Sequence, residues 1–333
     1  MITVPDGYVS KLGLYDTQNA IGKIKQTFFT ALCENLNLKR ATAPLFVESN
    51  TGINDDLNGV ERPVKFDIKA TGGYAEVVHS LAKWKRLALK RYDFYVGKGL
   101  ITDMNAIRRD EDLDNLHSIY VDQWDWEKVI TKEERNFDYL KKTVGQIVNA
   151  IITTRDALVA RYPELDLEIE KNIKFITSQE LEDMYPSLTP KEREYEIVKE
   201  YKTVFIMQIG GKLKSGIVHD GRAPDYDDWA LNGDLLFYHK TLDCALEVSS
   251  MGIRVDAESL DRQLKIAGCD NRRNLMYHKM LLNNELPLTI GGGIGQSRLC
   301  MFLLEKAHIG EVQASVWDDE TVKYCNEKGV ILL

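Results

Sequence analysis

The sequence predicts an α+β fold in which an antiparallel β-sheet is flanked by helices. Strand-like segments at residues 234–239 and 242–253 follow each other with no helix between them, as in a β-hairpin. This order differs from the alternating strands and helices that build a parallel sheet. No repeat, low-complexity segment or Pro/Ser-rich linker divides the chain. We therefore expect residues 1–333 to form a single domain.

Two long amphipathic helices are predicted. The first begins at an N-cap at Asp16-Thr17 and runs to Leu36. The second spans about residues 132–160. Apolar residues recur at helical spacing in both: Ile21, Ile24, Phe28, Leu32 and Leu36, then Phe137, Leu140, Val144, Ile147, Ile151 and Leu158. Shorter helices are expected at 82–91, which is strongly basic, at 272–283 and at 297–306.

Further strands are predicted at 41–48, 116–126 and 203–209. Pro44 interrupts the first and makes it an edge or interface strand, because proline cannot donate a ladder hydrogen bond. The third ends at Gly210-Gly211.

Composition excludes several classes of protein. Hydrophobic residues make up 44% and charged residues 28%, as in a globular protein. A net charge of -8 disfavours nucleic acid as a partner. No apolar run approaches the ~20 residues of a membrane helix, and the N-terminus does not resemble a signal peptide. Five cysteines without C-x-x-C spacing indicate free thiols, so a cytoplasmic location is expected. They are Cys33, Cys244, Cys269, Cys300 and Cys325.

The stretch TIGGGIGQSRLCMFLL at 289–304 places four glycines before one arginine. It is not a Walker A loop, because no Gly-Lys-Ser/Thr follows the glycines. It does not match the Rossmann fingerprint either, because its glycines come in a different order. A plain turn before a helix is one interpretation. The other is a nucleotide platform, since glycine lets a ligand approach the backbone and Arg298 suits a phosphate or a purine.

Two polar side chains extend an apolar strand face. Ile119, Val121, Gln123 and Asp125 alternate onto one side of the predicted strand. Gln123 and Asp125 either mark a solvated strand end or line a pocket floor. In the second interpretation, Asp125 would bind a substrate ammonium.

Acidic residues gather between 225 and 247. A solvated loop is the ordinary explanation of Asp225, Asp227 and Asp228. Glu247 differs, because it lies inside an apolar strand, and with Asp234 it could hold Mg²⁺ against a triphosphate. The sequence shows no zinc-like histidine spacing and no G-x-S-x-G motif.

Several long strings together resemble ammonia-dependent asparagine synthetases, the aspartate–ammonia ligases. They are HSLAKWKR at 79–86, VDQWDWE at 121–127, RAPDYDDW at 222–229, LEVSSMGIRVD at 246–256 and IGGGIGQSR at 290–298. The resemblance extends over nearly the whole chain. It implies a fold like the catalytic core of class II aminoacyl-tRNA synthetases, working as a homodimer with Pro44 at the interface.

The resemblance also implies a reaction. L-aspartate, ATP and ammonia give L-asparagine, AMP and pyrophosphate through a β-aspartyl adenylate. Arg108 resembles the arginine that grips the α-phosphate, and Arg298 the one that covers the adenine or γ-phosphate. Gly293 and Gly295 would lie against ATP. Asp234 and Glu247 would hold Mg²⁺, with Ser250 beside them, and Gln123 would bridge the carboxylate and the phosphate.

Aspartate itself needs partners for one ammonium and two carboxylates. Asp125 is the candidate for the ammonium, and Lys85, Ser80 and Arg254 are candidates for the carboxylates. Asp55, in the loop 52–59, resembles a family active-site acid. With Asp227 it would attract ammonium and act as general base.

Alternatives remain open. A class II aminoacyl-tRNA synthetase paralogue is the nearest, although no anticodon-binding module is evident. A non-enzymatic nucleotide-binding paralogue is another, although Arg108, Arg298, Asp234 and Glu247 are all present. Position 2 is Ile rather than the cysteine of glutamine-using enzymes, which favours free ammonia. A short loop is expected around Ala230, between Asp227 and Asp234.

Overall fold

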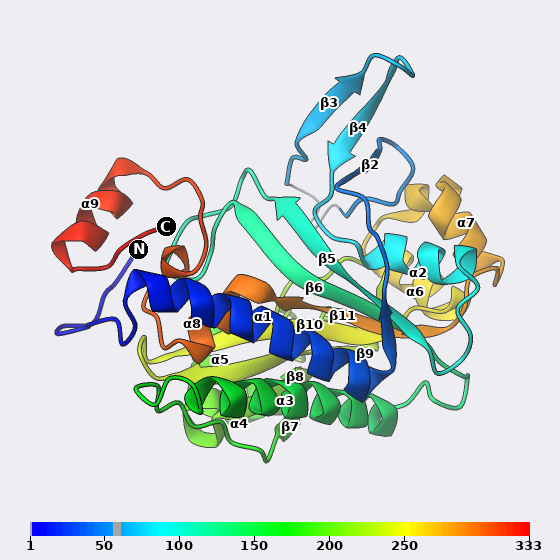
Figure 1. Cartoon of the computed structure of the whole chain (residues 1–333). Helices are drawn as coiled ribbons and strands as arrows, with labels where there is room; N and C mark the ends of the chain where they lie inside the picture. The colour runs from blue at the N-terminus through cyan, green and yellow to red at the C-terminus, as the bar shows by residue number, and fades with distance from the viewer. Residues whose placement is uncertain (1, 56–60) are drawn as a thin grey trace.

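A mixed, mostly antiparallel sheet forms the centre of the molecule (Figure 1). The computed structural model describes residues 2–55 and 61–333, and within them this sheet has the order β1-β5-β6-β11-β10-β9-β8-β7. Its strands are β1 (Leu38–Arg40), β5 (Gly99–Ile107), β6 (Tyr120–Val129), β7 (Lys174–Thr177), β8 (Thr203–Met207), β9 (Asp227–His239), β10 (Cys244–Arg254) and β11 (Thr289–Gly295). Only the outermost pairs, β1–β5 and β7–β8, are parallel. The predicted antiparallel sheet is confirmed.

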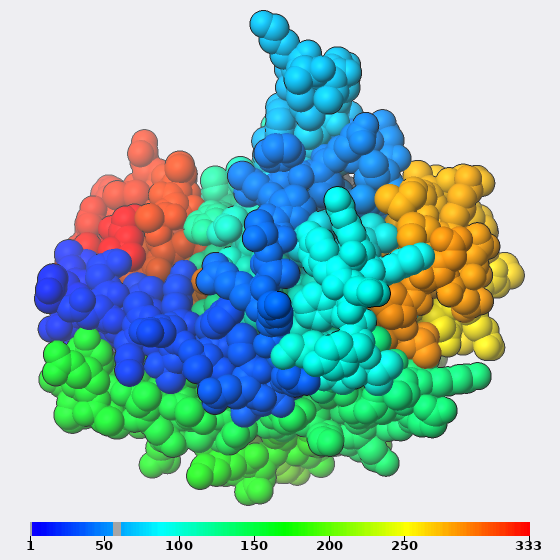
Figure 2. Space-filling model, turned by 45° about the vertical axis from the view of Figure 1, so that its right-hand side comes forward, coloured from blue at the N-terminus to red at the C-terminus, as the bar shows by residue number. Residues whose placement is uncertain are grey.

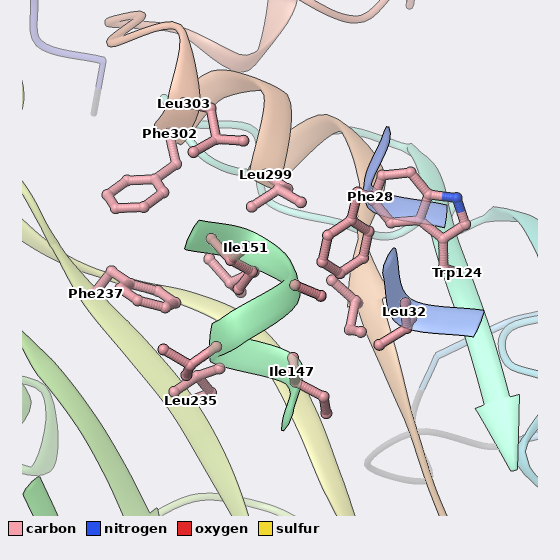
Figure 3. Close-up of a cluster of buried hydrophobic side chains, with 14 of the residues drawn as sticks. Phe28, Leu32, Trp124, Ile147, Ile151, Leu235, Phe237, Leu299, Phe302 and Leu303 are labelled. Carbon is pink, nitrogen blue, oxygen red and sulfur yellow. The ribbon is translucent and has the colours of Figure 1, made fainter. Parts of the chain in front are cut away.

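One face of the sheet carries the main hydrophobic core. The predicted long helices, α1 (Leu14–Leu36) and α3 (Phe137–Val159), cover this face together with α8 (Gln296–Leu303). Figure 3 shows how their apolar side chains meet those of the strands. The labelled residues are Phe28, Leu32, Trp124, Ile147, Ile151, Leu235, Phe237, Leu299, Phe302 and Leu303. All ten are buried, so this core holds the sheet rigid behind its opposite face.

The opposite face is covered only at its two sides. On one side lie α2 (Ala82–Arg91), α6 (Ala257–Ile266), η1 (Asp270–Asn274) and α7 (Met276–Leu282). On the other lie α4 (Ser178–Met184) and α5 (Pro190–Tyr201), which pack on β8 and β9. Between these groups, residues of β6, β10 and β11 line a cavity.

A second, small sheet projects from the body (Figures 1 and 2). It has the order β2-β4-β3, with β2 (Phe46–Glu48), β3 (Lys65–Ile68) and β4 (Gly73–Val77). The strand predicted at 41–48 is confirmed only for its last residues, and these form an edge of the small sheet rather than of the main one. Pro44 lies before the strand and is half-buried.

The chain ends lie next to each other beside α9 (Asp319–Glu327) and η2 (Ile309–Glu311). Val4 packs in one cluster with Ala307, Cys325 and Val330. The described helices are all too short or too polar to cross a bilayer.

Three local predictions need correction. The segment 272–283 is broken into η1 and α7 rather than one helix. Ala230 lies inside β9 and not in a loop. Residues 228–231 form a bulge opposite Ile253 of β10, and β9 is paired with β10 on both sides of this bulge. Finally, the glycines of 289–295 form the strand β11, not a turn.

Candidate active site

A cavity of about 580 Å³ opens on the uncovered face of the sheet. It brings together nearly all the residues that the sequence analysis singled out, from segments far apart in the chain. Those lining it are Asp55, Ser80, Lys85, Arg108, Gln123, Asp125, Asp227, Glu247, Ser250, Arg254, Gly293, Gly295 and Arg298. Asp234 is not part of this lining, but it pairs with Arg222 and lies in register with Ser250, which both belong to it. Residues 56–59 of the predicted loop 52–59 lie outside the described part of the chain.

A row of residues in register crosses four strands on the floor of the cavity. Asp234 of β9 pairs with Ser250 of β10, Ser250 with Gly293 of β11, and Gly293 with Asp125 of β6. Paired residues on adjacent strands point to the same face. The register therefore places two carboxylates and a hydroxyl in line across the sheet, with a glycine between them.

The glycines of β11 leave room for their neighbours' side chains. A Cβ on Gly293 would lie 2.8 Å from Asp125 Oδ1, and it would also collide with the Gln123 amide. A Cβ on Gly291 would lie 2.8 Å from the Arg254 guanidinium. The polar side chains of β6 and β10 thus extend over a bare strand, which only glycine permits.

A β-bulge in β10 aims two side chains into the cavity. The pairing with β9 shifts between Glu247 and Ser249, so Glu247 and Ser250, three residues apart, both line the cavity. Regular alternation would place one of them in the core.

Lys85 and Asp125 form a buried pair in the cavity wall. Lys85 Nζ lies 3.3 Å from Asp125 Oδ2 and donates to the Gly292 carbonyl at 3.0 Å. Burial lowers the pKa of Lys85 from its ordinary value, and Asp125 offsets this only in part. The interpretation of Asp125 as a solvated strand end is wrong, because the residue is 2% exposed and β6 continues to Val129.

Arg254 is held between two buried carboxylates. Its Nε and Nη2 each lie 3.2 Å from Glu127 Oε2, and its Nη1 donates to Asp227 Oδ1 at 2.5 Å. Thr289 Oγ1 donates to the second oxygen of Glu127 at 2.8 Å. Burial disfavours the charge of Arg254, but Asp227 and Glu127 outweigh it and raise its pKa. The guanidinium is thus fixed and charged.

An acidic corner surrounds Tyr226. Asp55 is buried and accepts a hydrogen bond from Ser80 Oγ at 2.9 Å. Burial, followed by the charges of Asp55 and Asp227, raises the pKa of the Tyr226 hydroxyl well above its ordinary value. Both carboxylates therefore act on the same phenol. The solvated-loop interpretation of the 225–228 acids is wrong, since Asp225, Asp227 and Asp228 are all buried.

Two arginines in the lining make only weak contacts with acids. Arg108 Nη1 lies 3.8 Å from Glu111 Oε2, and no described residue accepts from its buried Nε. Arg298 Nη1 donates to the Glu247 carbonyl at 3.2 Å and lies 4.0 Å from the Glu247 carboxylate. Both guanidinium groups thus retain capacity for an anion.

Asp234 forms an ion pair with Arg222, which lines the cavity. Arg222 Nη2 forms an ion pair with Asp234 Oδ2, and its Nη1 lies 3.3 Å from Asp220. Asp234 Oδ1 is buried and receives no hydrogen bond from any described residue. Burial and Glu247 raise the pKa of Asp234 to about 7, although Arg222 opposes them. Asp234 and Glu247 offer carboxylate oxygens to a hard cation, while no cluster of three potential ligands occurs in the described chain.

Three residues of the site were not anticipated as site residues. Glu127 continues the alternation of Gln123 and Asp125, so extending that pattern by one step would have found it. Arg222 and Tyr226 lie in the quoted string at 222–229. Nothing in its spacing indicates that their side chains enter the cavity.

Comparison with known proteins adds to this geometry. A sequence model of the family described as aspartate-ammonia ligase matches residues 15–329. Aspartate–ammonia ligase from Clostridium perfringens is 61% identical over 331 residues, covering 99% of this chain and 98% of the relative. The enzyme of that name from Ruminiclostridium cellulolyticum is 62% identical over 330 residues, with the same coverage.

The fold has known counterparts as well. Asparaginyl-tRNA synthetase from Pyrococcus horikoshii, complexed with asparaginyl-adenylate, superposes with a TM-score of 0.66 at 15% identity, covering 91% of this chain and 70% of that one. The Entamoeba histolytica enzyme gives 0.61 at 14% identity, covering 90% and 67%. These likenesses show a class II aminoacyl-tRNA synthetase fold. The family match and the identities of about 60% over nearly the full length establish that the chain belongs to the aspartate–ammonia ligase family.

Proposed function

We propose that this protein makes L-asparagine from L-aspartate and ammonia, using ATP and releasing AMP and pyrophosphate. The observation that carries the proposal is the cavity itself, which combines two arginines with room for an anion and a buried set of groups that complements aspartate. Residues 1–333 would act as one catalytic domain. The side-chain carboxylate of aspartate attacks the α-phosphate, pyrophosphate leaves, and ammonia then displaces AMP from the β-aspartyl adenylate.

The nucleotide would lie between Arg108 and Arg298. Arg108 stabilises the charge that develops at the α-phosphate, and Arg298 covers the purine or the γ-phosphate. Gly293 and Gly295 of β11 leave room for the side chains of Gln123, Asp125 and Arg298, and the nucleotide would lie against these groups. The structural neighbour from Pyrococcus horikoshii, which is complexed with asparaginyl-adenylate, supports activation through AMP.

Aspartate would bind at the other end of the cavity. Asp125 and Lys85, 3.3 Å apart, match an α-ammonium and an α-carboxylate in adjacent positions. Arg254, fixed by Glu127 and Asp227, and Ser80 are the remaining partners for carboxylate oxygens. Gln123 bridges the side-chain carboxylate and the α-phosphate. Attack thus needs positioning and charge neutralisation rather than a protein nucleophile.

Ammonium would enter the acidic corner at Asp55 and Asp227. Asp227 already binds Arg254 at 2.5 Å, so its charge is shared with a fixed cation. We assign both the attraction of ammonium and the general base to the pair of carboxylates, Asp55 and Asp227. Ammonia released there attacks the activated carboxyl carbon, and AMP leaves.

Mg²⁺ would be held by Asp234 and Glu247, with Ser250 beside them. The unsatisfied Asp234 Oδ1 and the half-exposed Glu247 suit a cation that shares its shell with phosphate oxygens. Bound there, the ion would neutralise charge on the triphosphate. Arg222 holds Asp234 in its present position.

A homodimer in the cytoplasm, acting without nucleic acid or membrane, completes the proposal. Phe46 and Phe66 are exposed and pack edge to face at 5.2 Å on the projecting sheet, as expected of a protein-binding surface. All five cysteines are free. The net charge of -8 disfavours tRNA as a partner. Light scattering in solution tests the dimer.

Product analysis tests the reaction. Purified protein with aspartate, ammonium and ATP-Mg²⁺ should form asparagine and AMP in equal amounts, with no tRNA present. Release of ADP, or AMP formation only with tRNA, would contradict the proposal and favour a different ligase or a tRNA synthetase paralogue. Arg298→Ala should lower turnover by about 10²–10³-fold.

A further inference from the structure

Behind the aspartate end of the cavity, a buried carboxylate is contacted by a lysine, an arginine and a histidine. Asp225 is fully buried. Its Oδ2 lies 2.8 Å from Arg272 Nη1, 2.9 Å from His278 Nε2 and 3.4 Å from Lys83 Nζ. Arg272 and His278 do not line the cavity. We call these four residues the Asp225 hub.

The hub joins the segments that carry the proposed aspartate-binding groups. Lys83 precedes Lys85 by two residues on α2. Asp225 is followed directly by Tyr226 and Asp227, which line the cavity.

The third segment is residues 52–55, which include Asp55. A Cβ on Gly52 would lie 2.9 Å from Leu275 Cβ and 3.4 Å from His278 Nδ1, so this segment packs directly against the start of α7. The three walls of the aspartate subsite, namely residues 52–55, α2 and residues 226–227, therefore converge on the hub.

Two of the hub residues, Arg272 and His278, belong to a well-packed region formed by α6, η1 and α7. His278 belongs to α7, whose neighbouring residues Tyr277 and Leu281 are buried in an apolar cluster with Leu260 and Leu264 of α6. Arg272 comes from η1, between these helices. Helices α6 and α7 thus pack together outside the cavity, and Arg272 and His278 connect them to the cavity walls through Asp225.

The charge of Asp225 makes the hub sensitive to the positions of the segments around it. Burial would raise the pKa of Asp225, but Lys83, the His278 hydrogen bond and Arg272 outweigh it and hold that pKa far below its ordinary value. An ionised carboxylate only accepts hydrogen bonds, so His278 Nε2 donates to it. Two cations and one imidazole, from three different segments, contact the same oxygen, and a shift of any segment would leave the buried carboxylate poorly paired.

We propose that Asp225 is a positioning residue, which through Lys83, Arg272 and His278 sets the spacing of the groups that bind aspartate and ammonium. The inference rests on the proposed function, because the aspartate subsite is defined there. Arg108 follows β5 and Arg298 lies on α8, outside the segments that the hub joins. Loss of the hub should therefore affect aspartate much more than ATP.

Asp225→Asn tests this, because asparagine keeps the size of the side chain and removes its charge. The KM for aspartate should rise about ten- to a hundredfold and kcat should fall, since small misplacements of reacting groups are costly. The KM for ATP should change less than about twofold. Glu182→Gln is the matched control: Glu182 is also buried and pairs with Arg193 at 3.3 Å, but it joins α4 to α5. This control should lose stability and keep its KM for aspartate.

A pair of His278 variants covers the case in which Asp225→Asn does not fold. His278→Gln can still donate to Asp225 and should retain most of the aspartate affinity. His278→Leu cannot donate and should show the raised KM for aspartate. Equal aspartate KM values in the two variants would overturn the proposal.

Other outcomes are equally decisive. If Asp225→Asn folds and keeps the wild-type KM for aspartate, or if the KM values for aspartate and ATP rise together, Asp225 is merely structural. A wild-type protein that makes no asparagine contradicts the proposed function instead. Calorimetric titration with L-aspartate then tests the hub alone: weaker binding by Asp225→Asn than by wild type supports it, and no binding by the wild type overturns it.

Discussion

Gly293 and Asp125 face each other across β11 and β6 with no space between them for a methyl group. A Cβ on Gly293 would lie 2.8 Å from Asp125 Oδ1. The glycines of this strand are therefore needed first by the protein's own side chains. Asp125 and Gln123 extend over the space that a side chain on Gly293 would fill.

Replacing Gly293 should damage the site rather than the fold. In Gly293→Ala, the new methyl group displaces Asp125 and Gln123, and we expect kcat/KM for aspartate to fall by about 10²-fold. Steady-state kinetics measure this. Gly145→Ala in α3 is the control, because a Cβ there meets nothing within 4 Å. It should stabilise the protein by up to about 1 kcal/mol and leave the kinetics unchanged. Wild-type aspartate kinetics in Gly293→Ala would refute the steric argument.

Local pattern predicted the long helices and the late hairpin, and it drew attention to Asp125 and Arg298, which line the cavity. Most of the other candidate residues came from the family resemblance, and neither source predicted the role of the glycine stretch. Four glycines look like a turn because the sequence does not reveal what lies on either side. Gly293 has to be glycine because of Asp125, which lies 168 residues away in the sequence. Their contact depends on the register of β6 with β11. A bulge at Glu247 and Ser249 likewise changes which side chains face the cavity, and nothing local marks it.

The burial of charged side chains could not be predicted from the sequence either. The acids at 225–228 resemble a solvated loop, and the basic segment 82–91 resembles a surface helix. In the structure Asp225, Lys83, Lys85 and Arg86 are buried. Each charge is tolerated inside because its partner comes from a distant segment, as Lys83 does for Asp225. Pairing of that kind cannot be read from composition or periodicity, whereas the resemblance to a family identified the correct strings.

Adjacent arginines offer a sharp test of the phosphate site. Arg108 lines the cavity, whereas Arg109 is exposed outside it. Arg108→Ala should lower kcat by about 10²–10³-fold, because one charge-stabilising group at the α-phosphate is lost. Arg109→Ala removes the same side chain one residue away and should keep nearly full turnover. AMP release measures both. Similar losses in the two variants would mean that Arg108 has no special place at the phosphate.

Glu127 should matter for stability as well as for aspartate. It is fully buried between Thr289 and Arg254, so Glu127→Gln leaves Arg254 with Asp227 as its remaining carboxylate. We expect the free energy of unfolding to fall by about 3 kcal/mol, as for other broken buried pairs, and the KM for aspartate to rise. Denaturant unfolding and kinetics measure these effects. Asp261→Asn breaks exposed pairs with Lys265 and Arg273 and should change neither quantity much. A Glu127→Gln protein as stable as wild type would show that Asp227 alone neutralises Arg254.

Two buried histidines should make the fold sensitive to mild acid. Burial lowers the pKa of His239 and of His308 to about 4. In each ring Nδ1 accepts a backbone N–H, from Leu242 at 3.3 Å and from Gly310 at 3.0 Å, and Nε2 meets no partner among the described residues. Protonation of Nδ1 would break that bond, so both rings are neutral in the native state.

The sign of the effect follows from proton uptake. The unfolded chain protonates these histidines near pH 6.5, while the folded protein resists until about pH 4. The unfolded state therefore binds more protons in this interval, and stability falls as the pH falls. Each histidine should contribute a loss of about 2 kcal/mol between pH 6.5 and pH 5.

Unfolding by denaturant at both pH values measures the loss. His308→Asn can keep an acceptor for the Gly310 N–H but does not titrate, so it should remove about half of the histidine contribution. If His308→Asn loses stability between pH 6.5 and pH 5 as steeply as wild type, protonation of His308 is not what destabilises the fold.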